Sequence, residues 1–487
     1  MNAAENSQAQ PRLLRKINLL DATLLVIGSV IGSGIFMTSG IIAGYLPSPG
    51  HLLLVWAIGG LITVCGALSF GELGAMYPSA GGPYIYIREA YGPWAGFLFG
   101  WGFFWFIMCG GIATLAVGFA EFAGYFIPAV STQTAVLRLD IFGLPYVLSA
   151  GQLVAAAAIL ILTAVNYFGV KAGVIVQNIL TFLRLGSVAA IVIFGLTLGK
   201  RAGIAGFGEL FRGEDVLSWG FLQAFGLALI AVFWTYDGWY AVNCTAEEIK
   251  KPERTIPLSL LLGTLSVTVI YLLVNVVYIL ALPVEKMRGV VRIGELASTQ
   301  LFGPIATSAI AAAIMVSVFG CLSATILYGP RVYLAMAEDR AFFRSMTFIH
   351  PRYRVPSKAL TGQAIWSCLL CLSGKYQALY EYVVFALVIF FAATGFAVIV
   401  LRRRRPGLLR PYRVWGYPAV PILFVLINVA VFLNTVTAQP LKSLIGLAFL
   451  LVGIPAYFYW KRKGPAGLDG GPHGNCFRHP RIEEKGV

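Results

Sequence analysis

The chain has 487 residues, of which 58% are hydrophobic and only 12% are charged, and its net charge is +15. This composition excludes a soluble globular protein and a disordered chain, and it indicates a protein embedded in a membrane. The basic excess could suggest nucleic acid as a partner, but the positions of the basic residues favour a different explanation.

Twelve apolar runs are each long enough to cross about 30 Å of hydrocarbon at roughly 1.5 Å per residue. They predict an all-α polytopic membrane protein with twelve transmembrane helices and no separate soluble domain. The ninth run is short, so that helix could be tilted or half-buried. No cleavable signal peptide is expected, because residues 1–10 are polar and the first apolar run is too long. The runs lie at residues 19–45, 51–76, 93–127, 147–168, 173–198, 219–244, 257–282, 303–336, 359–374, 377–401, 417–437 and 442–460.

Most of the 36 Lys and Arg residues fall in the loops on one side of these spans. This positive-inside asymmetry places both termini in the cytoplasm of a protein of the cell membrane, plasma or inner. The basic excess is therefore a topology signal, with some attraction to anionic lipid, and nucleic acid is not an expected partner. The basic residues on the inner side include Arg12, Arg15, Lys16, Lys250, Lys251, Arg254, Arg331, Arg340, Arg344, Arg402 to Arg405, and Lys461 to Lys463.

The reactive residues do not form a metal site or a disulfide framework. None of the seven Cys lies in a predicted outer loop, and all four His lie in loops or at span ends. Cys368 and Cys371 have the spacing of a metal or redox pair, but inside an apolar helix packing is favoured. A phosphate-binding Gly-rich loop is also missing from the sequence, which argues against a primary pump. We therefore expect no enzyme, no metal and no cofactor.

The first run contains three glycines in seven residues, Gly28, Gly32 and Gly34. Each glycine disfavours a helix by roughly 1 kcal/mol relative to Ala, and in lipid every freed backbone group needs a partner. Glycines grouped at mid-depth therefore suggest a helix that is broken beside a polar cavity. The N–H groups near Ser33, Gly34 and Ile35 would attract an anion, and the carbonyls near Val30 and Ile31 a cation. A small-residue packing face is the alternative.

A second interruption lies in the sixth run, at Phe233-Trp234-Thr235-Tyr236-Asp237-Gly238-Trp239. The first and sixth runs are five spans apart, and an odd number of spans inverts the second unit in the membrane. Paired broken helices in inverted halves indicate the central site of a transporter, which favours a substrate site over simple packing. Between them, Glu72 to Tyr84 ends the second span in a tight inner loop that serves as a connector and contributes to gating.

Together these segments resemble the amino acid–polyamine–organocation superfamily and its L-type amino acid transporter branch. The resemblance rests on Gly28 to Phe36, Glu72 to Tyr84, Phe233 to Pro257, Tyr328 to Asp339, Leu401 to Pro406 and Arg410 to Pro418, in this order. It covers residues 12 to 462 and implies a LeuT-like fold with broken helices 1 and 6. The implied organisation is a cytoplasmic segment at 1–18, two inverted five-helix repeats at 19–198 and 219–401, helices 11 and 12 at 417–460, and a cytoplasmic tail at 461–487.

The resemblance also implies roles for individual residues. It assigns the substrate carboxylate to Ile31, Gly32, Ser33, Gly34 and Ile35. It assigns the substrate ammonium to carbonyls near Val30, Ile31, Phe233 and Trp234. Trp234 matches the position that closes over bound substrate from outside, as a gate.

Two departures from the branch pattern affect coupling and partners. Arg184 occupies the position where members often carry Lys, and an Arg effectively cannot lose its proton. We interpret Arg184 as a permanent cation that fills the place of a sodium ion and ties the first helix to the eighth; a purely structural tether is the alternative. The loop at 128–146 has no Cys, so a disulfide-linked heavy subunit is not expected, and a bacterial-type single-chain carrier is favoured.

Asp237 is the best clue to specificity. Its carboxylate could meet a cationic substrate, but capping the second half of the sixth helix is favoured. Phe233, Trp234, Tyr236, Trp239 and Cys109 would line a mostly apolar pocket, with Thr235 and Gly238 completing the site. We expect a secondary-active exchanger of L-amino acids, neutral ones preferred, that works by alternating access. The alternatives are a cationic amino acid carrier, a proton-coupled symporter, or a membrane amino acid sensor.

Overall fold

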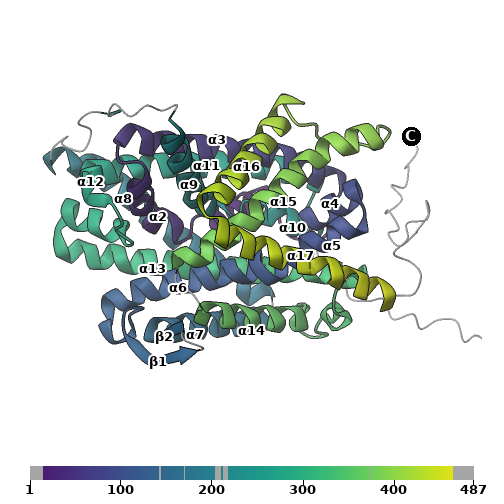
Figure 1. Ribbon diagram of the computed structural model, residues 1–487, viewed down its shortest axis with the longest axis horizontal. Coiled ribbons are helices and arrows are strands. Elements are labelled where there is room, and N and C mark those ends of the chain that lie inside the picture. Colours follow the sequence, from purple (N-terminus) through teal and green to yellow (C-terminus); the bar gives the residue numbers. More distant parts are fainter. Residues whose placement is uncertain are drawn as a thin grey trace, which may run out of the picture.

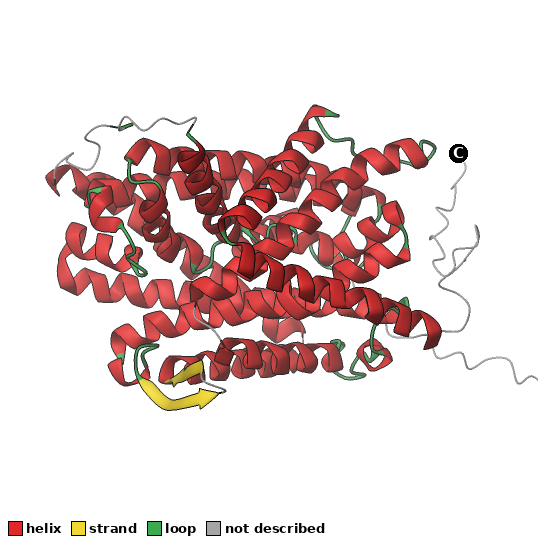
Figure 2. Ribbon diagram, in the orientation of Figure 1, coloured by secondary structure: helices red, strands yellow, loops and turns green. Residues whose placement is uncertain are grey.

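The computed structural model describes residues 15–141, 144–168, 170–202, 210–211, 218–373 and 376–463. Most of these residues are helical (Figures 1 and 2). The elements are α1 (Leu19–Val30), α2 (Gly34–Tyr45), α3 (Pro49–Met76), α4 (Pro83–Tyr91), α5 (Pro93–Gly102), η1 (Phe103–Met108), α6 (Cys109–Phe126), η2 (Pro128–Val130), β1 (Ala135–Ile141), β2 (Leu144–Ser149), α7 (Ala150–Tyr167), α8 (Val170–Ala202), α9 (Trp219–Tyr236), α10 (Ala241–Cys244), η4 (Ala246–Glu248), α11 (Pro252–Ala281), α12 (Val284–Met287), α13 (Ile293–Glu338), η5 (Arg344–Thr347), α14 (Ser357–Ser373), α15 (Tyr376–Arg404), α16 (Ala419–Ala438) and α17 (Pro440–Lys463).

Each predicted span coincides with a helix or with two or three consecutive helical pieces. In the described part of the chain, ten helices are long and apolar enough to cross a membrane, and the bent pair α1 and α2 makes an eleventh. The ninth predicted span is α14, which has only 17 residues. The chain is therefore a polytopic, mostly helical membrane protein.

Local sequence signals account for several helix starts. Asn18 and Asp21 form a capping box at α1, and Ser149 and Gln152 form another at α7. Such boxes satisfy two backbone N–H groups that the first helical turn leaves free. Helices α3, α4, α5 and α11 begin with Pro, whose fixed φ suits the first helical position.

One short β-hairpin departs from the predicted all-α pattern at one end of the molecule. Strands β1 and β2 form an antiparallel hairpin between α6 and α7, at the lower left of Figure 2. The physical reason is the alternation of apolar and polar residues from Leu137 to Ile141, which suits a strand and not a helix. Residues 147–149, which were predicted to start the fourth span, belong to this hairpin. We call this side the hairpin end and the opposite side, where α4 lies, the α4 end.

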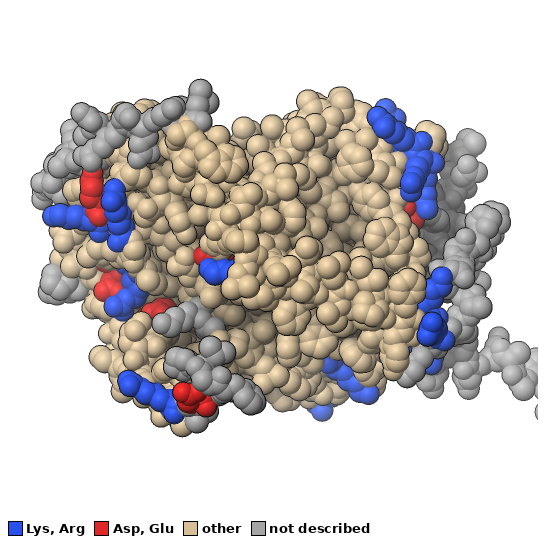
Figure 3. All heavy atoms as spheres, viewed as in Figure 1, with Lys and Arg blue, Asp and Glu red and all other residues tan. Residues whose placement is uncertain are grey.

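Charged side chains are scarce in the middle of the molecule. In Figure 3, Lys and Arg gather toward the two ends, and the broad band between them is almost entirely uncharged. At the α4 end, the buried Glu72 of α3 pairs with Arg402 of α15 at 2.6 Å and lies 3.6 Å from Arg410. Arg331 of α13 pairs with Glu248 at 3.1 Å. These pairs fasten the ends of several helices outside the apolar band.

Candidate functional site

The two interrupted helices touch each other at their breaks. Helix α1 ends at Val30, α2 starts at Gly34, and the two pieces are bent by 43°. Helix α9 ends at Tyr236, and a turn of four residues leads to the short α10. The breaks predicted from the glycines and from Asp237-Gly238 are therefore present, and neither segment is an uninterrupted helix.

Glycine allows this close approach at two positions. A Cβ on Gly34 would lie 2.6 Å from Thr235 Oγ1 and 2.9 Å from its Cα. A Cβ on Gly238 would lie 2.6 Å from the Ser29 carbonyl oxygen, and Gly238 also has a φ of +99°. Real Cβ atoms do not approach that closely, and a φ of this sign strains other residues. The start of α2 thus packs against the end of α9, and the end of α1 against the turn after α9.

A small cavity lies between these breaks. Its volume is about 30 Å³, which is room for roughly two water molecules. Polar groups from both breaks meet apolar side chains from η1 and α6, together with residues of α13. The lining residues are Ser29, Val30, Gly32, Ser33, Gly34, Ile107, Met108, Gly111, Leu115, Trp234, Thr235, Asp237, Gly238, Tyr240, Cys321, Thr325 and Tyr328.

The start of α2 offers unpaired N–H groups to this cavity. Ser33 is the N-cap residue, but its side chain does not cap the helix. No partner among the described residues accepts a hydrogen bond from the N–H groups of Gly34 and Ile35. Free N–H groups at a helix start carry partial positive charge and bind anions, carboxylates among them. The cavity therefore has one wall that suits an anion.

The carbonyls at the end of α1 are already hydrogen-bonded by three other helices. Arg184 of α8 donates to the Gly28 carbonyl, and Cys321 of α13 lies 3.2 Å from the Ser29 carbonyl. Tyr271 of α11 lies 3.0 Å from both the Val30 and the Thr235 carbonyls, so one hydroxyl bridges the two breaks. Each carbonyl oxygen has a second lone pair, which leaves it able to accept one further hydrogen bond.

Arg184 lies in the protein interior between α1 and α13. Its side chain is fully buried, and a Cβ on Gly320 of α13 would collide with its Nη2. Nε and Nη2 have no hydrogen-bond partner among the described residues. The guanidinium thus makes the contacts expected of a tether between the first and eighth spans, at the cost of burying a charge without a carboxylate.

Eight of the thirteen predicted site residues line the cavity, and five do not. The lining ones are Val30, Gly32, Ser33, Gly34, Trp234, Thr235, Asp237 and Gly238. The others are Ile31, Ile35, Cys109, Phe233 and Tyr236. Successive residues of a helix point about 100° apart, so consecutive positions cannot all face one cavity.

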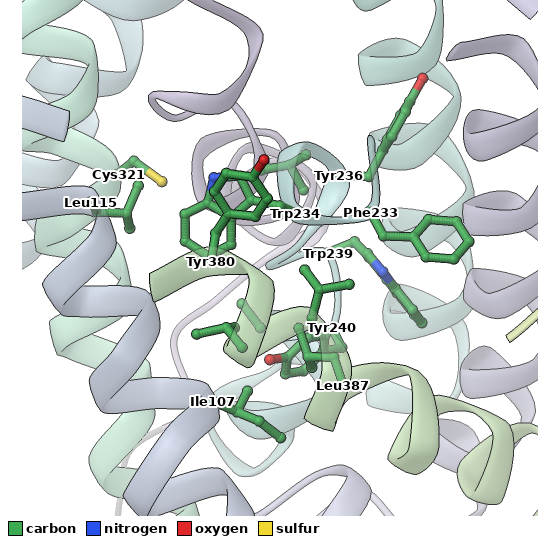
Figure 4. Packing of buried hydrophobic residues seen from close by; sticks show 14 of the residues in the cluster. Ile107, Leu115, Phe233, Trp234, Tyr236, Trp239, Tyr240, Cys321, Tyr380 and Leu387 are labelled. Carbon is green, nitrogen blue, oxygen red and sulfur yellow. The ribbon is translucent and has the colours of Figure 1, made fainter. Parts of the chain in front are cut away.

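The side chains outside the cavity make other contacts. Cys109 faces α14, with its Sγ 3.7 Å from the Gln363 carbonyl. Tyr236 donates to the Trp56 carbonyl of α3 at 3.3 Å. In Figure 4, Phe233 and Trp239 point away from the group formed by Trp234, Leu115 and Cys321. In this conformation, Cys109, Phe233, Tyr236 and Trp239 therefore do not line the cavity.

Sequence reasoning missed nine lining residues. These are Ser29, Ile107, Met108, Gly111, Leu115, Tyr240, Cys321, Thr325 and Tyr328. Ile107 and Met108 belong to the π-helical segment η1, a feature common at functional sites but without a signal in this apolar sequence. Tyr328 begins one of the segments on which the family resemblance rests.

Asp237 supplies a carboxylate to the cavity. It accepts a hydrogen bond from the Gly238 N–H, while its Oδ1 is buried without a partner among the described residues. The expected cap of the helix after the break is absent, because α10 starts at Ala241 and its N-terminus has no side-chain cap. Among the described residues, no group of three or more His, Cys, Asp or Glu could hold a metal ion.

A bundle of membrane-spanning helices around paired breaks and a polar cavity defines a membrane protein with an internal small-molecule site. The chain belongs to the amino acid permease family, whose sequence model matches residues 17–454. It is similar to the serine/threonine exchanger SteT of Bacillus subtilis, with 32% identity over 93% of this chain and 98% of that protein. It is 30% identical to the human b(0,+)-type amino acid transporter 1, over 92% of this chain and 88% of that protein. It is 26% identical to the human cystine/glutamate transporter, over 95% of this chain and 89% of that protein. The family and these relatives are transporters, not enzymes.

Proposed function

We propose that the chain is a secondary-active exchanger of L-amino acids that works by alternating access through the cavity between the two breaks. The observation that carries this proposal is the direct contact of the two breaks, Gly34 with Thr235 and Gly238 with Ser29. Broken helices facing each other at a central cavity are typical of secondary transporters. Family membership and the exchangers among the relatives support the same function.

The proposed substrate orientation follows from the charges around the cavity. The carboxylate binds the free N–H groups of Gly34 and Ile35 together with the Ser33 hydroxyl. The ammonium group binds the carbonyls that end α1 and α9, through lone pairs that Tyr271 leaves free. The substrate side chain extends toward Met108, Asp237, Tyr240 and Tyr328, and Trp234 closes the site as a gate. The cavity must widen for binding, because about 30 Å³ does not hold an amino acid.

We propose neutral amino acids as the preferred substrates, because most of the lining side chains are apolar or uncharged. A cationic amino acid is the second candidate, and a specific observation favours it. Asp237 Oδ1 is buried beside the cavity without a partner in the part of the chain that the structure describes, and a substrate ammonium or guanidinium group could pair with it.

In this proposal, Arg184 substitutes for a coupling ion. Its permanently charged guanidinium lies between α1 and α13 and already donates to the Gly28 carbonyl. Neither sodium nor proton coupling is then required at this position; a proton-coupled symporter remains the alternative mechanism. We further propose two inverted five-helix repeats at 19–198 and 219–401, followed by helices at 417–460.

The orientation and partners form a further part of the proposal. The positive-inside rule places the α4 end in the cytoplasm with both termini, at 1–18 and 461–487, and the hairpin end outside the cell membrane. The partners are the amino acid substrate and membrane lipid. No heavy subunit linked by a disulfide is expected, since the loop at 128–146 contains no Cys.

Reconstituted liposomes test the function directly. We expect uptake of radiolabelled neutral amino acids into vesicles preloaded with amino acid and little uptake into empty vesicles. Sodium and pH gradients should leave exchange unchanged. Uptake into empty vesicles driven by a proton gradient would favour the symporter, and binding without turnover would favour an amino acid sensor.

A further inference from the structure

A chain of three polar side chains connects the gate tryptophan to the break of the first helix. Trp234 Nε1 donates to Tyr376 Oη at 2.9 Å. The same Oη lies 3.1 Å from Ser33 Oγ, the N-cap of α2. Tyr376 is the first residue of α15, is 4% exposed and does not line the cavity. One hydroxyl therefore joins α9, α15 and the carboxylate wall of the proposed site.

The chemistry of the three groups orients this chain in one direction. An indole N–H can only donate, so Trp234 occupies a lone pair of the Tyr376 oxygen. The phenol O–H of Tyr376 then still needs an acceptor. If Ser33 donated to Tyr376, the phenol proton would be buried without an acceptor, since no other partner of Tyr376 occurs among the described residues. The opposite arrangement avoids this cost, because Ser33 lines the cavity and its own proton can reach a ligand.

The surrounding packing fixes this geometry. A Cβ on Gly118 of α6 would lie 2.9 Å from Ser33 Cβ and 3.3 Å from Tyr376 Cε2, so α6 packs tightly behind both residues. Tyr380, one helical turn after Tyr376, stacks on Trp234 with ring centroids 6.0 Å apart, as seen in Figure 4. The ring of Trp234 is thus held by stacking and by one hydrogen bond.

We propose that Tyr376 is a positioning residue that couples carboxylate binding to the gate. Its phenol donates to Ser33, which turns the Ser33 proton toward the substrate carboxylate, and it accepts from Trp234, which holds the gate closed. A carboxylate on Ser33 polarises the chain and strengthens the Trp234 hydrogen bond. An occupied site therefore keeps the gate closed more firmly than an empty one. The inference deepens the proposed exchanger and rests on it.

The test uses the full chain in liposomes and compares three variants. Tyr376→Phe removes the hydroxyl and keeps the ring, and Ser33→Ala removes the terminal donor. Tyr382→Phe is the matched control, because it removes a hydroxyl from the same helix at a half-buried residue that does not line the cavity. We expect Tyr376→Phe and Ser33→Ala each to raise KM for exchanged amino acids about tenfold, with Tyr382→Phe within about twofold of wild type.

Two further measurements separate coupling from general damage. The double variant Ser33→Ala/Tyr376→Phe should lose no more affinity than either single variant, because both interrupt one chain. Inhibition by the corresponding amino acid methyl esters, which lack the carboxylate, should be unchanged by Tyr376→Phe. Additive losses, or a KM for Tyr376→Phe equal to that of Tyr382→Phe, would overturn the proposal.

The outcomes also separate this inference from the function on which it rests. If wild-type protein exchanges amino acids and Ser33→Ala keeps full affinity, the coupling role fails and the exchanger stands. This holds even when Tyr376→Phe does not fold, as judged by gel filtration in detergent. If wild-type protein neither binds nor exchanges amino acids, the proposed function fails, and this inference fails with it.

Discussion

At the scale of single residues, the site depends on positions where a side chain does not fit. Gly34 and Gly238 differ from most glycines of the chain because their missing Cβ atoms would meet backbone atoms of the other break. Backbone cannot move aside as a flexible side chain can. The two breaks therefore remain in contact only while both positions are glycine.

Gly34→Leu should abolish amino acid binding. The added side chain would overlap Thr235 and occupy the place of the substrate carboxylate. Gly44→Leu is the matched control, since a Cβ at Gly44, in the same helix, meets nothing within 4 Å. Binding is measured by scintillation proximity with labelled leucine or alanine. Retained affinity in Gly34→Leu would contradict the carboxylate position.

Asp237→Asn separates the two substrate candidates. If neutral amino acids are preferred, the variant should lower exchange of neutral and cationic substrates to a similar extent, because the carboxylate then acts through its hydrogen bond to the Gly238 N–H in the turn after α9. Initial exchange rates for leucine, serine, lysine and arginine provide the measurement. A selective loss of lysine and arginine would instead establish a cationic carrier.

The sequence predicted the residues of the breaks better than the residues around them. The glycines and Asp237 can be recognised from the sequence alone, since both residue types are unfavourable in a membrane helix and their presence there indicates a function. Cys109 and Tyr236 cannot be assigned in this way, because whether their side chains line the cavity depends on which way each helix faces. That direction is set by packing against α14 and α3. Tyr376 was missed because it is separated from Ser33 by 343 residues.

At the scale of elements, the end of α1 is held by side chains of α8, α11 and α13. Arg184, Tyr271 and Cys321 each contact a different carbonyl of its last turn. The free carbonyls of a helix end normally bind water or a cap, neither of which lipid supplies. The broken helix is therefore maintained by its neighbours, and its position depends on theirs.

Replacing Arg184 by Met should separate stability from transport. The substitution removes a buried cation whose Nε and Nη2 have no partner among the described residues, which offsets the loss of the bond to Gly28. We expect the Tm to stay unchanged or rise while the exchange rate falls about tenfold or more, because α1 is no longer tied to α13. Unfolding in detergent and exchange in liposomes are the two measurements.

Arg138→Met provides the control for this prediction, since Arg138 lies exposed on the hairpin. Arg138→Met should alter neither the Tm nor the exchange rate. Normal exchange by Arg184→Met would show that the guanidinium is not part of the transport cycle.

The elements themselves were largely predictable, and one was not. Apolar runs specify membrane helices because length and hydropathy suffice, and all twelve predicted runs are mainly helical. The hairpin at 135–149 was missed because a search for long apolar runs ignores short alternating strands. The bend of α13 at Gly303, where φ is +78°, was also not predicted from the sequence.

At the scale of the whole molecule, we expect the cavity to have one closure toward each end. The candidate closure toward the hairpin end is formed by Trp234, Tyr376 and Tyr380, which are joined by a hydrogen bond and by ring stacking. Toward the α4 end, Asn243 after the second break donates to the Phe70 carbonyl at 3.1 Å. A cavity this small cannot exchange its contents without movement, so the two closures must open in turn for transport.

The closure at the α4 end includes the segment before α1. Ile17 pairs with Ile249 as an isolated bridge, and the Glu248 carbonyl accepts hydrogen bonds from the N–H groups of Lys16 and Ile17. The Glu248 side chain pairs with Arg331, whose own side chain is 4% exposed. Glu248 thus joins the start of the chain, the loop after α10 and the end of α13.

Glu248→Gln should open this end more often. It weakens an ion pair with a buried arginine, whose loss costs more than that of an exposed pair. With Cys321 as the only cysteine, we expect its labelling by a maleimide added from the α4 end to accelerate about tenfold. Glu295→Gln is the control, because it weakens the Arg292–Glu295 pair near the start of α13, before its Gly303 bend. Equal labelling rates in the two variants would show that the Glu248 contacts do not hold the closure, and that this end is controlled by the other ion pairs.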